Sequence, residues 1–160
     1  MKMHASIAVL AIALASASAH AALGGHETSV AGEVQAQRAL NHSARPSTKT
    51  ASGAIYTRHD LALAGGGSIS EYADVDGLVF AVTWSTATMP DLDSLLGEHK
   101  AELDAAQIQS RATGIRSPRN LSVAHGDLSL SSTGHMRAYR GQAHLTSLLP
   151  QGFDLKELSK

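Results

Sequence analysis

The chain has 160 residues, enough for one domain, and carries 13 basic against 14 acidic residues, a net charge of −1 at pH 7. This balance argues against a nucleic-acid partner, which requires a clustered basic face. The chain contains no cysteine, which excludes disulfides, thiolate metal sites and a cysteine nucleophile.

Residues 1–21 have the pattern of a secretory signal peptide. Lys2 gives a positive start, and an apolar run interrupted only by serines ends in the small-residue site Ala19-His20-Ala21. The run is shorter than the roughly 20 apolar residues of a membrane-spanning helix, so we favour a cleaved peptide over an anchor. We predict cleavage near Ala21 and export to the periplasm or the medium, with no stable membrane anchor afterwards.

A polar lead segment is predicted over residues 22–52. It contains no aromatic residue and no long apolar run, so it offers too little apolar surface to offset the entropy of ordering it. No aromatic residue precedes Tyr56, and aromatic side chains dominate core burial. The folded domain is therefore expected to occupy residues 53–160.

The first part of this domain reads as three strands. Residues 53–63 alternate between apolar and polar side chains, and a glycine turn at 65–67 leads to a second strand. Asp76-Gly77 then predicts a tight hairpin turn, because both residues tolerate a positive φ. The alternation after this turn places four large apolar side chains on one face, which we expect to be the core face: Leu78, Phe80, Val82 and Trp84.

One long helix is predicted from Pro90 to about Gln109, with Thr88 as its cap. Its leucines recur at helical spacing and form a stripe that would pack on the sheet: Leu92, Leu95, Leu96 and Leu103. Three further strands are expected at about 121–124, 127–132 and 135–142, with a turn at Ser131–Gly134. The fold class is therefore α+β in the order βββ-α-βββ, with a single antiparallel sheet of about five to six strands packed against one long helix.

The sequence contains no recognised catalytic template. It has neither a Gly-x-Ser-x-Gly elbow nor a phosphate-binding loop with its lysine, and we predict no cofactor. Histidines are numerous but scattered, and no metal site is predicted. His99 and Glu102 have a spacing that can chelate a metal, but they lack the second histidine of a zinc-binding helix. His99 also falls on the apolar stripe of the helix, so we favour a packed core histidine at this position.

A short polar stretch near the C-terminus is the candidate ligand site. If residues 135–142 form one strand, then His135, Arg137 and Tyr139 share a face and could bind an anion or a carboxylate. An ordinary solvent-exposed sheet face has the same pattern, because such faces are normally polar, and we favour that simpler interpretation.

Several segments of the chain, in this order, match a known family. They are Ala22-Leu23-Gly24-Gly25, Glu71-Tyr72, the strand 77–84, Met89-Pro90-Asp91-Leu92, Leu95-Leu96-Gly97 and 134–139. In these segments the chain resembles a family of short exported proteobacterial proteins that is catalogued as domain of unknown function 2844. The resemblance implies export and a single small domain, and it brings no activity and no functional residues.

From these observations we expect a non-enzymatic exported protein, either a binding protein or an accessory protein of the cell envelope. Its partner would be an envelope protein or a small anionic ligand. Two alternatives stay open. One is a metal-dependent or histidine-using hydrolase that employs His59, His99, His125 or His135. The other is a structural protein of envelope assembly, tethered by residues 22–52.

Overall fold

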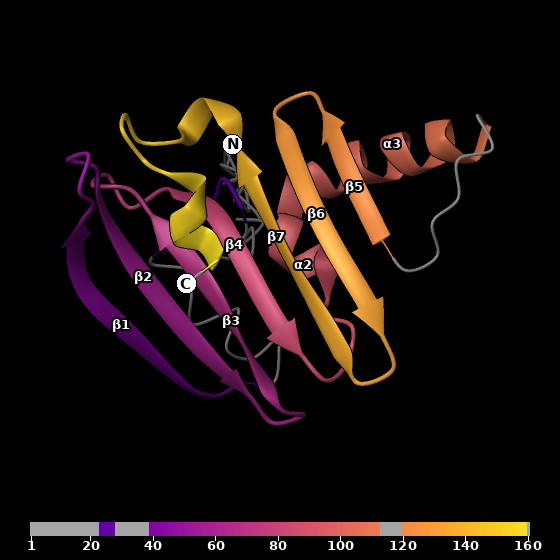
Figure 1. Cartoon of the computed structure of the whole chain (residues 1–160), viewed down its shortest axis with the longest axis horizontal. Helices are drawn as coiled ribbons and strands as arrows, with labels where there is room; N and C mark the ends of the chain where they lie inside the picture. The colour runs from indigo at the N-terminus through magenta and orange to yellow at the C-terminus, as the bar shows by residue number, and fades with distance from the viewer. Residues whose placement is uncertain (1–22, 28–38, 113–119, 160) are drawn as a thin grey trace, which may run out of the picture.

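A computed structural model describes residues 23–27, 39–112 and 120–159 (Figure 1). Seven antiparallel strands form one sheet in the order β1-β2-β3-β4-β7-β6-β5. The strands are β1 (Ala39–Lys49), β2 (Ile55–Leu63), β3 (Gly67–Ala73), β4 (Val79–Thr86), β5 (Asn120–His125), β6 (Leu128–His135) and β7 (Ala138–Leu145). The helical elements are α2 (Leu92–Leu96), η2 (Gly97–His99), α3 (Lys100–Ala112), η3 (Thr146–Leu148) and η4 (Leu155–Ser159). The expected signal peptide, residues 1–21, lies outside the described residues.

A single antiparallel sheet with helices on one face agrees with the predicted class, but the strand count and order differ. Four strands precede the helices and three follow them, because residues 39–49 pair with β2 as an edge strand. The sequence places these residues in a polar lead. None of the described β1 side chains is buried. Backbone pairing and a few polar side-chain contacts hold this strand in the sheet, so its sequence shows no apolar alternation that would predict a strand.

The face assigned to Phe80 is wrong, because β4 contains a β-bulge. Tyr72 pairs with Ala81 and Ala73 pairs with Val79, which leaves Phe80 as the additional residue on its strand. The bulge turns the Phe80 side chain to the face opposite the helices. An alternation with period two cannot reveal such an insertion.

The core on the helix side is built around Trp84, which is 3% exposed. The indole belongs to the same buried cluster as Leu95, Leu96 and Leu103, and Leu92 packs against the edge of that cluster. Helices α2 and α3 lie behind the sheet in the view of Figure 1.

The predicted continuous helix is broken near its middle. Asp91, and not Thr88, caps its first turn, because the Asp91 carboxylate accepts hydrogen bonds from the backbone N–H groups of Asp93 and Ser94. At Gly97 the backbone has a φ of 51°, and a short 3₁₀ turn connects α2 to α3. A positive φ interrupts the α-helical path, so two leucine-bearing segments meet the sheet instead of one.

The C-terminal segment covers part of the opposite face, where it crosses in front of β3 and β4 (Figure 1). Its Phe153 ring meets Phe80 edge to face, with 4.9 Å between the ring centres, and contacts Tyr56 in the same way at 5.4 Å. Tyr72 and Leu158 complete this second apolar cluster. Because the segment is narrow, it leaves the rest of this face open.

A short N-terminal segment, Leu23 to Glu27, closes the end of the core. The Leu23 side chain is 2% exposed, and its N–H donates to the carbonyl of Leu95 at 2.9 Å. The Gly24 N–H donates to the carbonyl of Val79 at 2.8 Å, and the Glu27 N–H to that of Gly77 at 2.7 Å. Residues far upstream of the predicted domain thus belong to its core.

Trp84→Ala is expected to reduce the free energy of unfolding by about 3–5 kcal/mol, because it leaves a large cavity between the sheet and the leucines. Trp84→Phe should cost less than half as much. The indole N–H has no hydrogen-bond acceptor among the described residues, so phenylalanine removes a buried polar group together with the volume. Urea denaturation followed by far-UV circular dichroism measures both variants. A loss below about 1 kcal/mol for Trp84→Ala would contradict this account of the core.

Candidate ligand-binding groove

Five neighbouring strands place polar side chains in two rows across the open part of the sheet face. Residues that are paired across adjacent strands point to the same face, so the register alone defines the rows. The first row is Asp60, Ser70, Thr83, Gln142 and Ser131, and the second is Ala62, Ser68, Ser85, Arg140 and Thr133.

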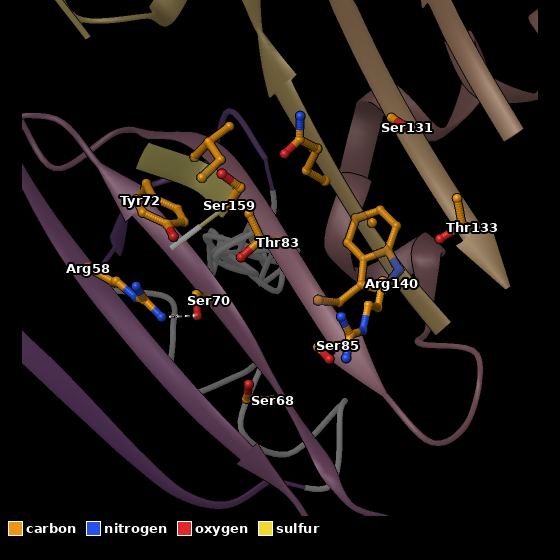
Figure 2. Close-up of a pocket in the computed structure, with 14 residues that line it drawn as sticks. Arg58, Ser68, Ser70, Tyr72, Thr83, Ser85, Ser131, Thr133, Arg140 and Ser159 are labelled. Carbon is orange, nitrogen blue, oxygen red and sulfur yellow. Dashed lines mark hydrogen bonds between the residues drawn. The ribbon is translucent and has the colours of Figure 1, made fainter. Parts of the chain in front are cut away.

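Apart from Asp60 and Ala62 on β2, the residues of these rows form the floor of a groove of about 520 Å³ (Figure 2). Arg58 lies toward one end of the groove, and Arg140 and Thr133 lie toward the other. Leu158 and Ser159, from η4, line it as well, so the C-terminal segment forms one wall. The volume falls within the range of about 300–1,000 Å³ that is typical of small-molecule sites.

The charge of Arg58 is neutralised inside the protein. Its Nε donates to Asp60 Oδ1 at 2.7 Å, and Ser70 Oγ donates to the same oxygen at 2.6 Å. Arg45 Nε, from β1, donates to Asp60 Oδ2 at 2.7 Å. Burial by itself would raise the pKa of Asp60, but the hydrogen bonds from Ser70 and the two arginines outweigh it and lower the pKa below its ordinary value. Asp60 is therefore a carboxylate at neutral pH and fixes Arg58 in place.

Arg140 is placed differently. Its side chain is exposed, and its guanidinium makes no hydrogen bond or ion pair with any residue that the structure describes. Its register partners are Ser85 on β4 and Thr133 on β6, both neutral hydroxyls. An uncommitted guanidinium beside hydroxyl groups can bind a carboxylate or phosphate in a bidentate manner while the hydroxyls bind its polar neighbours.

The Tyr72 side chain, which is 1% exposed, also lines the groove. Burial raises the pKa of Tyr72 above its ordinary value, so the phenol stays neutral throughout the physiological range. Tyr72 therefore contributes a neutral hydroxyl and no charge.

The candidate face predicted at residues 135–139 is not assembled in the expected way. His135 pairs with Ala138, so the hairpin turn lies at Met136 and Arg137 rather than at 131–134. Arg137 occupies this turn with a φ of 62°, and His135 and Tyr139 lie on different strands.

Gly134 explains why the predicted turn is misplaced. Glycine in a polar run indicates a turn, yet Gly134 lies within β6 opposite Tyr139. A Cβ atom at this position would come within 2.7 Å of Tyr139 Cδ1, so only glycine accommodates the ring lying over the strand.

The histidines proposed for a hydrolase do not converge. Among the described residues, no group of three or more His, Asp or Glu side chains has the geometry to hold a metal ion. His99 Nδ1 is 2.8 Å from Glu102 Oε1, and Glu102 Oε2 accepts a hydrogen bond from the Leu128 N–H at 3.2 Å. The hydrogen bond from His99 lowers the pKa of Glu102, and the pair connects α3 to the start of β6. His125 and His135 are exposed at the ends of β5 and β6.

A signal for the groove is nevertheless present in the sequence. Hydroxyl or polar side chains recur at every second position in four separate segments: Ser68 and Ser70, Thr83 and Ser85, Ser131 and Thr133, and Arg140 and Gln142. Assigning residues 131–134 to a turn hides one of these pairs. The four pairs become neighbours only through the order of the strands in the sheet. The alternation within each segment does not predict that order.

A family model described as "Protein of unknown function (DUF2844)" matches residues 19–158. No curated protein and no solved structure matches the chain. Within the described residues, no helix is long and apolar enough to cross a membrane.

Asp60→Asn is expected to lower the free energy of unfolding at pH 7 by about 1–3 kcal/mol, because it weakens charge-assisted hydrogen bonds from two arginines. The pKa of Asp60 is lower in the folded than in the unfolded state. The contribution of ionised Asp60 to the free energy of unfolding is therefore complete above about pH 5, and it is lost as the pH falls through the folded-state pKa. The variant should show a flatter loss of stability between pH 5 and pH 3 in urea denaturation.

Asp104→Asn is the matched control for this prediction. Asp104 pairs with Lys100 on the exposed surface of α3, where an ion pair contributes little, so a change below about 0.5 kcal/mol is expected. If Asp60→Asn follows the acid dependence of the unmodified protein, the role assigned to the Asp60 network is wrong.

Proposed function

Since the chain belongs to the DUF2844 family, whose function is unknown, we propose its function from the groove. We propose that it is a non-enzymatic exported binding protein that holds a small, polar, anionic ligand on the open face of its sheet. Arg140 binds the anionic group, and the hydroxyl rows bind the polar groups beside it.

The observation that carries this proposal is the contrast between the two arginines of the groove. Arg58 is held by Asp60, whereas the Arg140 guanidinium has no partner among the described residues. A charged group kept free beside neutral hydroxyls supports recognition of an external anion. All the floor residues lie on paired strands, so the site is formed before the ligand arrives and loses little entropy on binding.

The lining chemistry favours binding over catalysis. A serine or threonine hydroxyl becomes a nucleophile when a base lies within hydrogen-bond distance. No histidine is among the described lining residues, and Ser70 alone among their hydroxyls donates to a carboxylate, that of Asp60 at 2.6 Å. Two arginines already hold this carboxylate and its pKa is lowered, so it is a poor base. A histidine-using hydrolase therefore receives less support than a binding protein, because its candidate residues lie on separate elements.

Export is supported by the pattern of residues 1–21 and by the segment that follows them. Cleavage near Ala21 would leave Leu23 in the mature chain, where its side chain fills the end of the core. A processed protein would thus keep every described core residue.

The experiment is a titration of ¹⁵N-labelled protein with galacturonate, succinate and inorganic phosphate, with neutral galactose as the comparison. We expect at least one anion to shift amide signals of β6 and β7, and Arg140→Gln to weaken its affinity by about tenfold or more. Arg137→Gln, which alters an arginine of the adjacent turn outside the groove, should leave the affinity unchanged. Anion binding that is equal in all three proteins would place the site elsewhere, and no binding at all would refute the proposal.

A further inference from the structure

A chain of three titratable side chains joins the N-terminal segment to the edge of the sheet on the helix side. His59 Nε2 lies 2.9 Å from Glu27 Oε2, and His59 Nδ1 lies 3.1 Å from His42 Nε2. His59 is 7% exposed, whereas His42 is exposed on β1. The contacts therefore run from the N-terminal segment through a buried imidazole to an exposed one.

The two imidazoles are joined end to end. Their planes differ by 19° and their centres are 5.3 Å apart, which is the separation expected when a 3.1 Å N–N contact lies along the line between the rings. A carboxylate only accepts hydrogen bonds, so His59 Nε2–H donates to Glu27 and its Nδ1 accepts from His42 Nε2–H. This hydrogen-bond pattern requires that at least one of the two facing nitrogens carries no proton.

Strand β1 has few other side-chain contacts to hold it. None of its described side chains is buried, and it pairs with β2 alone. Its register shifts between Ala39 and Asn41 and again between Arg45 and Thr48, so the regular part of the ladder is centred near His42. An edge strand with little apolar burial belongs to the least stable part of a fold, and a single contact can decide whether it stays paired.

We propose that the Glu27–His59–His42 chain is an acid-released latch that holds β1 on the sheet at neutral pH and releases it when both imidazoles are protonated. Double protonation places an N–H on both facing nitrogens, which removes the bond between the rings and sets two positive charges against each other. The backbone pairing of residues 41–45 then has to hold the strand without help from this contact.

Acidic and basic groups of the neighbouring elements surround the chain. Glu27, from the N-terminal segment, and Glu71, fully buried on β3 opposite His59, are the acidic groups that face it. Arg45, on β1 itself, points to the other face and pairs with Asp60.

The fold opposes a proton on His42. Burial lowers the pKa of His42 below its ordinary value, and the charge of His59 lowers it further. When folding lowers the pKa of a histidine, the stability gained from its neutral form is complete above about pH 6.5. This stability is lost as the pH falls through the folded-state pKa. Release is therefore expected as the pH falls below about 6.5.

The test is amide hydrogen exchange of the full chain at pH 7.5 and pH 5.0, with each rate divided by its intrinsic rate at that pH. We expect the protection of residues 41–45 to fall by about tenfold or more at pH 5.0 relative to that of β4, because the edge strand then loses the contact between its imidazole and that of β2. Normalising to β4 removes any global acid effect, such as that of His144, a buried histidine whose pKa burial lowers.

His42→Gln isolates the latch, because an amide can donate to His59 Nδ1 without titrating. In this variant we expect residues 41–45 to stay protected at both pH values, with less than a twofold change. His125→Gln, an exposed histidine on β5 outside the chain, should behave as the unmodified protein does. The proposal is overturned if the unmodified β1 is equally protected at both pH values, if it is unprotected at both, or if His42→Gln shows the same acid-dependent loss.

Discussion

The whole fold depends on strand β4 being covered on both of its faces. On one face, Trp84 packs among the leucines of α2 and α3, with Leu23 at the end of the core. On the other, Phe80 packs under Phe153 of the C-terminal segment. The bulge at Phe80 makes this possible, because it directs large apolar side chains to both faces of the same strand. The open groove is the part of the second face that the narrow C-terminal segment leaves uncovered.

Apolar periodicity predicts the class of the fold, but it does not predict local irregularities such as a bulge or a glycine inside a strand. The leucine stripe and the Asp76-Gly77 turn correctly indicated a helix packed on an antiparallel sheet, because burial of large apolar side chains imposes those patterns. Two residues depart from these patterns. The alternation predicts the wrong face for Phe80, because a bulge shifts it by one residue. Gly134 predicts a turn, but its place in a strand is explained by the close packing of the Tyr139 ring.

The groove was harder to predict than the fold because it consists of small polar residues brought together by strand order. Neighbouring hydroxyls such as Ser85 and Thr133 are separated by a long stretch of chain and by one intervening strand. The open face normally carries polar residues in any case, so their presence alone does not distinguish a site. This groove is distinguished by its two arginines. Asp60 holds Arg58 in an ion pair but lies away from Arg140, whose guanidinium has no partner among the described residues. Because Arg45 of β1 also donates to Asp60, the edge strand and the groove share one carboxylate.

Leu23 through Glu27 pack against the domain, although they lie well before its first strand in the sequence. A chain shortened to begin at β2 would lose Leu23 from the core and Glu27 from beside His59, although every strand from β2 to β7 would be present. The smallest autonomous unit therefore begins upstream of the polar stretch and includes it. A fusion partner or tag at the N-terminal end would be attached next to Leu23, whose backbone N–H donates to the carbonyl of Leu95 at the edge of the hydrophobic core.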